Sequence, residues 1–491
     1  MGAGEEAGAE KGSVRSLWLE EALAGGGQES APRLEGEVRA DVCIVGGGFT
    51  GLWTALRLKE HEPTLDVVVL EADVCGGGAS GRNGGFVMSL WSKFSTLAKI
   101  CGREEALRLA HASAEAVEEI GAFCREHAVD AGYRHDGWLW TATSPAQLEA
   151  WEKTVQAVED AGGHAFERLD PAEVARRSGS ETHIGGVFEA SAASVHPAHL
   201  ARALRRAALE RGVRIFERSR MTRLLPSRPP RVTTSGGAVT ADVVVLALNA
   251  WVAGFAELRR KLVVVASDVV ATDPVGDRLE EIGWLNGLCI SDSRRLVNYY
   301  RTTIDGRIVF GKGGGTLAFA GRIGESFHRR SPRAVEVAAH LHRLYPMLAD
   351  VRATRSWRGP IDYSLDGLPF FTRLGGRPEI ILGAGYSGNG VGPSNLGGRI
   401  LASLALGRQD EWSTCGLART PSGKLPPEPA RFLGGLVVRA AIARKERRED
   451  EGGEPDPLTK AVAKLDPTSF VDRGSGAAVA STVDMAHGMS R

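Results

Sequence analysis

The sequence predicts an α/β fold, with a Rossmann-like domain and a second, discontinuous α+β domain built on a mixed sheet. Three observations predict this fold. Residues 40–72 have the pattern of a strand, a glycine turn, a helix and a strand, the middle of the chain mixes helical and alternating patterns, and residues 379–407 give a strand, a glycine turn and a helix again. We therefore expect a chain that leaves its first domain and returns to it.

Composition indicates an ordinary globular protein. The 491 residues are 43% hydrophobic and 24% charged, which is enough for two large domains with buried cores. Sixty basic residues balance sixty acidic ones, so no overall charge favours nucleic acid or an anionic membrane. The six cysteines are scattered without a CxxC pair, which predicts reduced thiols and no metal site. Without a signal-peptide or membrane-spanning pattern, we expect a cytoplasmic protein, either a monomer or a homodimer.

The first glycine turn carries a GxGxxG pattern, made by Gly46, Gly48 and Gly51 between a strand and a helix. Gly46 permits the tight turn, Gly48 lets a pyrophosphate approach the backbone, and Gly51 lets the helix lie close to the sheet. Glu71 ends the next strand, where a carboxylate can accept hydrogen bonds from both hydroxyls of an adenosine ribose. An ordinary glycine turn is the alternative, but this context favours a dinucleotide site.

A second GxGxxG match consists of Gly383, Gly385 and Gly388. No second strand ending in an acid follows it, because Gly407 stops the helix and polar residues come next. We interpret the match as a turn that approaches the other end of one large cofactor. Donors there would favour a reduced flavin, which carries negative charge near N1 and the C2 carbonyl.

A third glycine-rich stretch, VCGGGASGRNGG at residues 74–85, contains a single cation, Arg82. Backbone without side chains can pass against a diphosphate and a flat ring, while Arg82 neutralises phosphate or approaches the substrate. A flexible surface loop is the alternative.

These motifs belong to an ordered set of segments: DVCIVGGGFTGLWTALRL, VVVLEADVCGGGASGRNGG, SVHPAHLARALRRAALERGV, VVVLALNAW, and RSWRGPIDYSLDGLPFFTRL with GAGYSGNGV. The set resembles the FAD-dependent amino acid and amine oxidase family, which includes glycine oxidase, sarcosine oxidase and γ-glutamylputrescine oxidase. The resemblance covers roughly residues 36–410.

The resemblance implies that FAD lies along the first domain. It places the diphosphate at Gly46, Gly47, Gly48 and Gly51, and the adenosine ribose at Glu71. It also implies that two segments flank the isoalloxazine ring: Ser80, Gly81, Arg82, Asn83, Gly84 and Gly85, and then Gly385, Tyr386, Ser387, Gly388, Asn389, Gly390 and Val391.

The same resemblance divides the chain into parts. An FAD-binding domain is expected from residues 36–95, 195–256 and 353–410, and a substrate domain that covers the flavin face from residues 96–194 and 257–352. Outside these domains we expect a disordered or lead-in segment at 1–35, a C-terminal helical extension at 411–470 and a disordered tail at 471–491.

The flavin is predicted to be non-covalent. Some relatives attach it to a Cys shortly before the DG-P segment or to a His in the glycine loop. This sequence has Gly359 and Pro360 where that Cys would be expected, and it has no His between Cys75 and Gly85.

A narrower resemblance, carried by SLWLEEAL, CGGGASGRNGG and RFLGGLVVRAAIARKE, is to the aminophosphonate oxidoreductase group. It implies a zwitterionic substrate whose anionic end needs an Arg or Lys.

The implied reaction is hydride transfer to flavin from the carbon that bears a neutral amine, which gives an imine that water hydrolyses to a carbonyl compound. The electrons then pass to O₂, with release of H₂O₂, or to another acceptor such as a quinone. Two rival functions remain, a pyridine-nucleotide-linked flavin reductase and a non-catalytic FAD-binding subunit.

Substrate contacts are expected from Tyr299 and Arg301, which flank Tyr300 in LVNYYRT on a predicted strand. Alternation along that strand places two of the three side chains on one face. The alternative is an aromatic core with a surface charge. Lys312, in FGKGGG, could stabilise developing superoxide during flavin reoxidation, with a solvated lysine as the alternative.

Arg358 could bind an anionic group of the substrate, with pairing to Asp362 or Asp366 as the alternative. We expect His196 and His199 at a helix start rather than as bases, and Trp251 as a wall of the pocket. The segment PARFLGGLVVRAAIARKERRED joins an apolar stripe to basic residues, which predicts a helix packed on the body or on a second subunit rather than on a membrane surface.

Overall fold

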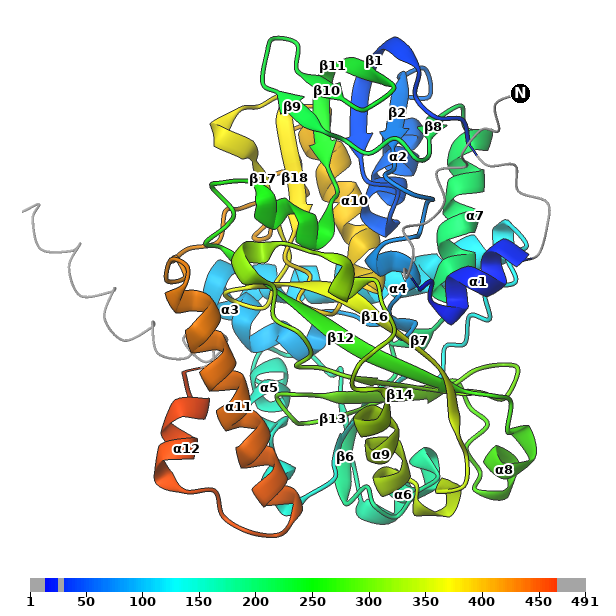
Figure 1. The fold of residues 1–491 in the computed structure, drawn as a ribbon, viewed down its shortest axis with the longest axis vertical. Helices are drawn as coiled ribbons and strands as arrows, with labels where there is room; N and C mark the ends of the chain where they lie inside the picture. Colours follow the sequence, from blue (N-terminus) through cyan, green and yellow to red (C-terminus); the bar gives the residue numbers. More distant parts are fainter. Residues whose placement is uncertain (1–13, 25–30, 466–491) are drawn as a thin grey trace, which may run out of the picture.

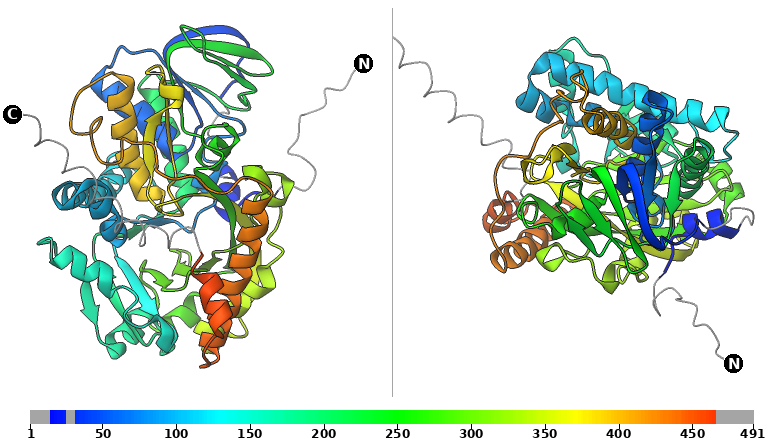
Figure 2. Two further views of the ribbon diagram at one scale, coloured as in Figure 1. Left: turned by 90° about the vertical axis from the view of Figure 1, so that its left-hand side faces the viewer. Right: turned by 90° about the horizontal axis from the view of Figure 1, so that it is seen from above.

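The computed structural model of the chain describes residues 14–24 and 31–465. Residues 1–13 and 471–491, predicted to be disordered, lie outside the described residues. Two large sheets form the body: the first lies with its helices in the upper half of Figure 1, and the second lies below it. Figure 2 shows the same two parts from the side and from above.

The first sheet has the Rossmann-like architecture that the sequence predicts. Its strands β18, β11, β1, β2 and β8 are each parallel to the next, while β17 is antiparallel at one edge and the β9–β10 hairpin pairs with β11. The strand bounds are β1 (Gly36–Val45), β2 (Val67–Leu70), β8 (Arg214–Phe216), β9 (Arg223–Leu225), β10 (Arg231–Thr233), β11 (Gly237–Leu246), β17 (Phe370–Arg373) and β18 (Ile380–Ala384).

The two faces of this sheet have different covers, because successive side chains of a strand point to opposite faces. On one face, Ile44 and Val69 pack with helices α2 (Phe49–His61), α4 (Arg103–Glu126), α7 (Pro197–Glu210) and α10 (Val391–Ala405). On the other face, Val45 and Leu70 pack with apolar residues of the β9–β10 hairpin and of the segment that follows β11. Both faces are buried, as in other parallel sheets.

The second sheet is mixed, as predicted. Its order is β16-β12-β15-β14-β13-β4-β6-β5, and every pair is antiparallel except β13 with β4. Its strands are β4 (Trp138–Ala142), β5 (Glu167–Leu169), β6 (Gly185–Glu189), β12 (Leu262–Thr272), β13 (Cys289–Asp292), β14 (Asn298–Thr302), β15 (Ile308–Lys312) and β16 (Ala353–Ser364). Helices α6 (Pro171–Ser178), α8 (Gly276–Glu281) and α9 (Ala334–Leu344) pack on its outer face.

The segment 353–410, expected in the first domain, divides between the two sheets. Strand β16 pairs with β12 along its length in the second sheet, whereas β17, β18 and α10 belong to the first. A small ribbon of β3 (Phe86–Val87) and β7 (Ala193–Ser194) leads from the glycine-rich loop toward the second sheet. The remaining helices are α1 (Leu17–Ala24), α3 (Phe94–Cys101), α5 (Glu152–Glu159), α11 (Ala430–Asp450) and α12 (Pro457–Ala463).

The predicted C-terminal helix packs on the body of the chain. In Figure 1, α11 and α12 lie beside the second sheet. Glu446 Oε1 accepts the N–H of Leu296 at 3.0 Å, and Asp450 pairs with Arg294 at 2.5 Å. No helix within the described ranges is long and apolar enough to cross a membrane.

Helices α2 and α10 approach each other closely at Gly398, where a Cβ would lie 2.7 Å from the Cβ of Trp53 and 2.9 Å from its carbonyl carbon. Gly398→Ala must therefore push the two helices apart. We expect the free energy of unfolding of the apoprotein, measured in denaturant, to fall by about 1–3 kcal/mol.

Gly434→Ala is the matched control, since Gly434 is also helical but exposed, with no atom within 4 Å of its Cβ position. The helix should gain about 0.5–1 kcal/mol from this change. Equal effects of the two substitutions would contradict the close packing of α2 on α10.

Candidate cofactor and active site

The first glycine turn joins β1 to α2 and depends on contacts that only glycine permits. Gly46 has a φ of +116°, and a Cβ there would lie 2.3 Å from the carbonyl oxygen of Ala247. A Cβ at Gly51 would lie 1.9 Å from the carbonyl oxygen of Gly46, so α2 lies directly against the turn. Backbone N–H groups at the start of a helix, reached through a turn without side chains, can bind phosphate.

Ser80 brings the glycine-rich loop to the same helix start. Its hydroxyl oxygen accepts the N–H of Phe49 at 2.9 Å, and a Cβ at Gly48 would lie 2.8 Å from that oxygen. The first turn and the loop therefore meet where a diphosphate is expected.

Glu71 lies at the end of β2 beside this turn, as predicted. Its Oε2 accepts the N–H of Gly47 at 2.8 Å, and its Oε1 accepts the N–H of Asp73 at 2.9 Å. Burial raises the pKa of Glu71, and the two N–H donors oppose that increase. The carboxylate is thus fixed at the position from which it can accept hydrogen bonds from ribose hydroxyls.

The stretch from Gly81 to Gly85 is a largely buried loop, so the alternative of a flexible surface loop does not describe it. Each of its five carbonyl oxygens accepts a hydrogen bond from outside the loop. The donors to the carbonyls of residues 81, 82, 83, 84 and 85 are, in that order, Ser16 Oγ, Trp357 Nε1, Trp18 Nε1, Arg301 Nε and Val195 N.

Arg82 supports this loop from within. It is 6% exposed, and its guanidinium donates to the carbonyl oxygens of Gly77, Val14 and Arg358 at 3.1, 3.2 and 3.3 Å. Burial lowers its pKa. Its side chain is therefore engaged with backbone, and a contact with phosphate or substrate stays a prediction.

The second glycine turn is held by the end of β16. Asp362 Oδ2 accepts the N–H of Gly385 at 2.5 Å, and the Asp362 carbonyl accepts the N–H of Ser387 at 3.2 Å. Burial raises the pKa of Asp362 to about 7, while the N–H groups of the turn lower it. The sequence did not single out this carboxylate for that role, because nothing local links residue 362 to residue 385.

Two hydrogen bonds join the second turn to helix α2 and to the segment after the glycine-rich loop. Thr50 Oγ1, on α2, donates to the Tyr386 hydroxyl at 2.8 Å, and Asn389 Nδ2 donates to the carbonyl of Ser89 at 2.8 Å. Gly390 then precedes Val391, the first residue of α10. The second turn therefore lies beside the start of α2 and beside the segment that follows the glycine-rich loop.

Tyr299 and Arg301 both lie on the face of the second sheet that meets the loop, which confirms the predicted alternation. The Tyr299 ring packs on Gly84, where a Cβ would lie 2.9 Å from its Cε2 atom, and its hydroxyl lies 2.8 Å from that of Ser267. Arg301 is 3% exposed and donates to the carbonyls of Gly84 and Val195 at 2.8 and 2.7 Å.

Lys312 lies on the opposite face, because it pairs directly with Asn298, one residue before Tyr299. It is 4% exposed, so the alternative of a solvated lysine is wrong. Its Nζ donates to the Leu296 carbonyl and to Asn298 Oδ1, both at 3.2 Å. Burial lowers its pKa to about 8.

Arg358 shares that outer face, and the expected pairing with Asp362 or Asp366 is wrong. Its Nε pairs with Asp268 Oδ1 at 2.9 Å, and Asp268 pairs directly with Lys312 across β12 and β15. The sheet itself therefore separates Arg358 and Lys312 from the glycine-rich loop.

His196 and Trp251 lie near the two ends of the glycine-rich stretch. His196 is the N-cap of α7 and accepts the N–H of His199 at 3.1 Å, which confirms the predicted helix start. Trp251 lies beside the loop at Gly78, whose Cβ position is 3.8 Å from the Trp251 ring.

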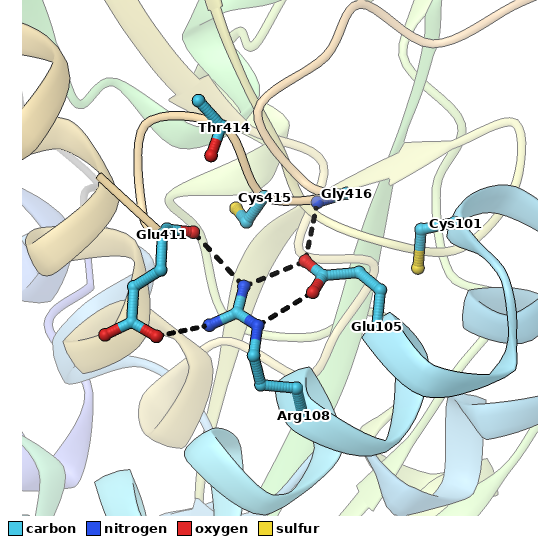
Figure 3. A pocket seen from close by; sticks show the side chains of 7 residues that line it. All are labelled: Cys101, Glu105, Arg108, Glu411, Thr414, Cys415 and Gly416. Atoms are coloured by element: carbon cyan, nitrogen blue, oxygen red, sulfur yellow. Dashed lines mark hydrogen bonds and ion pairs between the residues drawn. The ribbon is translucent and has the colours of Figure 1, made fainter. Parts of the chain in front are cut away.

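A separate polar hollow of about 410 Å³ lies between α3, α4 and the segment after α10 (Figure 3). Its charged groups bind one another, since Arg108 pairs with Glu105 at 2.7 Å and with Glu411 at 3.2 Å. None of the predicted site residues lines it. Over the part of the chain that the structure describes, no group of three His, Cys, Asp or Glu side chains could hold a metal ion.

The GxGxxG turn at a parallel sheet, together with the acid after β2, is typical of a dinucleotide-binding protein, here with a second sheet over the glycine-rich loop. The family model described as "DAO: FAD dependent oxidoreductase" matches residues 41–404. The chain therefore belongs to this family of FAD-dependent oxidoreductases, whose members oxidise amines and amino acids, and FAD is its cofactor.

Individual relatives agree with this assignment. Gamma-glutamylputrescine oxidoreductase of Escherichia coli is 33% identical over 83% of this chain and 91% of its own length. A probable oxidoreductase, OrdL, of Haemophilus influenzae is 28% identical over 78% of this chain and 86% of its own. The crystal structure of glycine oxidase from Geobacillus kaustophilus shares the fold, with a TM-score of 0.66 and 22% identity over 79% of this chain and all of that one.

Glu71→Gln tests the ribose site. Loss of the carboxylate charge removes charge-assisted hydrogen bonds, so we expect the dissociation constant of FAD to rise about 10- to 100-fold. Titration of apoprotein with FAD measures it. Asp73→Asn, which neutralises a neighbouring exposed carboxylate, is the control and should leave FAD binding unchanged. Equal dissociation constants for all three proteins would contradict this site.

Asp362→Asn tests the buried carboxyl under the second turn. Because its pKa is about 7 in the folded chain and near 3.8 in the unfolded chain, the folded state binds the extra proton between these values. The free energy of unfolding of the wild-type apoprotein, relative to the variant, should therefore fall as pH rises from about 4 to about 7 and then level off. A pH-independent difference in denaturant unfolding would refute the raised pKa.

Proposed function

We propose that this chain oxidises the C–N bond of a small amine or amino acid. The amine carbon loses a hydride and its nitrogen loses a proton, which gives an imine, and water converts the imine to a carbonyl compound and ammonia or an amine. FAD, which the turn at Gly46 to Gly51 and Glu71 would hold, would supply the hydride acceptor, and its two electrons would reduce O₂ with two protons to H₂O₂.

The observation that carries the proposal is that the inner face of the second sheet contacts both glycine segments. Tyr299 packs on Gly84 of the loop, and the Tyr363 hydroxyl lies 3.8 Å from the Cβ position of Gly388 in the second turn. Tyr299 and Tyr363 therefore lie on the sheet side of the two glycine segments, where the isoalloxazine ring is proposed to bind.

The groups on this face favour an amine that has lost its proton. Burial raises the pKa of Tyr299, which keeps its hydroxyl neutral, and Arg301 carries a positive charge beside the loop. A buried site and a nearby cation both disfavour an ammonium ion. The neutral amine is the form from which a hydride can leave, because its lone pair stabilises the cation that develops at the carbon.

Substrate identity is proposed from the relatives and from the narrower resemblance of the sequence. A γ-glutamylated diamine and an aminophosphonate are the two leading classes, and both carry an anionic end. Since Arg358 and Lys312 face away from the loop, neither is proposed to bind that end.

An anaerobic screen tests the function. Purified holoprotein is offered amino acids, N-methyl amines, γ-glutamylputrescine, free polyamines and 2-aminoethylphosphonate, and flavin reduction is followed by loss of its visible absorbance. We expect one class to bleach the flavin with saturation, and Tyr299→Phe to lower the rate constant of bleaching for that class.

Each rival function predicts a different result of the same screen. Bleaching by NADH or NADPH alone would indicate a pyridine-nucleotide-linked reductase, and no bleaching by any amine would indicate a non-catalytic subunit. Slow reoxidation by O₂ together with rapid reoxidation by a quinone would assign a dehydrogenase rather than an oxidase. Release of all flavin by acid precipitation is expected for a non-covalent cofactor.

A further inference from the structure

The loop from Gly81 to Gly85 is bound in part by a segment outside the family's matched region. Of the five donors to its carbonyl oxygens, Ser16 Oγ and Trp18 Nε1 belong to the lead-in at residues 14–24, whereas the family match begins at residue 41. Arg82 also donates to the carbonyl of Val14 at 3.2 Å. The lead-in is therefore attached to the loop at three points.

Trp18 is the centre of this attachment. Its Nε1–H donates to the Asn83 carbonyl at 2.9 Å, and the side chain is 2% exposed. Its ring meets Trp357 edge-on at 6.0 Å and His196 at 4.9 Å, and the Arg301 guanidinium lies 5.3 Å from its centre. Trp18 thus packs against residues of both domains as well as the loop.

A second link ties the same helix to the body. Glu21, on α1, lies 3.1 Å from the Nε2 atom of His196, the residue that caps α7. Burial lowers the pKa of His196, so at neutral pH this contact is a hydrogen bond from a neutral ring rather than an ion pair. The attachment of α1 therefore does not require a charge on His196.

Fixing a carbonyl also fixes the direction of the next N–H group. In a planar trans peptide the C=O of one residue and the N–H of the next point in opposite directions. Trp357 holds the Arg82 carbonyl and Trp18 holds the Asn83 carbonyl, so the N–H groups of Asn83 and Gly84 point away from these two indoles. Neither N–H has an acceptor among residues 14–24 and 31–465.

We propose that the lead-in segment 14–24 is a latch that orients these two N–H groups toward the isoalloxazine of FAD, with Trp18 as the positioning residue. The proposal rests on the placement of the ring beside this loop. Two oriented donors favour the electron-rich reduced ring over the oxidised one. The latch therefore sets both FAD affinity and the ease of reduction, although it lies before residue 41, where the family match begins.

Trp18→Phe tests the latch, because phenylalanine keeps an aromatic ring at this position and removes the N–H donor together with the five-membered ring of the indole. We expect the dissociation constant of FAD to rise about tenfold, the midpoint potential of bound flavin to fall, and its visible absorption band to shift. Ser16→Ala removes a donor to the Gly81 carbonyl and should have a smaller effect in the same direction. The thermal midpoint of the apoprotein should change little in Ser16→Ala and should fall in Trp18→Phe no further than in the matched buried-tryptophan control.

Trp151→Phe is the matched control, since Trp151 is also buried and donates its indole N–H, at 3.1 Å to Glu152, far from the loop. It should leave affinity, potential and spectrum as in the wild type. If Trp18→Phe behaves like this control while Glu71→Gln weakens FAD binding, the proposed role of segment 14–24 is wrong, whereas the proposed FAD site is supported. If neither Trp18→Phe nor Glu71→Gln affects FAD, the cofactor placement itself is wrong.

Discussion

The structure depends on one constraint, the capture of five consecutive carbonyl oxygens from Gly81 to Gly85 by donors that lie outside the loop. A run of main chain with so little side chain would be costly to order, because glycine loses the most conformational freedom on folding. The bonds offset that cost. They come from the lead-in, from β16, from β14 and from the segment before α7, so the loop also joins the two domains.

A buried carboxylate supports the start of the same glycine-rich stretch. Glu217 is fully buried, accepts the N–H of Cys75 at 2.8 Å, and pairs with Arg202 and Arg205 on α7 at 2.8 and 3.1 Å. Burial alone would raise the pKa of Glu217, but the N–H of Cys75 and the guanidiniums of Arg202 and Arg205 lower it overall. A buried charge is tolerated here because it is paired and hydrogen-bonded, and removal of either partner would leave an uncompensated ion.

The two faces of the second sheet carry different kinds of side chain. Its inner face presents Tyr299 and Ser267 to the glycine segments, whereas its outer face carries Asp268, Arg358 and Lys312 under α9 and α11. Arg358 pairs with Asp268, and Lys312 donates to the Leu296 carbonyl and to Asn298, so these charges are bound on the outer face and directed away from the glycine-rich loop. The inner face thus combines neutral side chains with one buried cation, Arg301, which donates to main-chain carbonyls of the loop and of Val195.

The sequence by itself determined the strand–turn–helix–strand unit that holds the GxGxxG turn and Glu71, and the shared face of Tyr299 and Arg301, because each follows from a motif or an alternation within one continuous stretch of the chain. Only the tertiary structure decided that Arg358 pairs with Asp268, that Asp362 holds the second turn, and that Trp18 and Trp357 bind the loop. Those partners are separated by 90, 23, 65 and 275 residues, respectively. No local periodicity encodes such contacts, since they exist only once the two sheets have packed together.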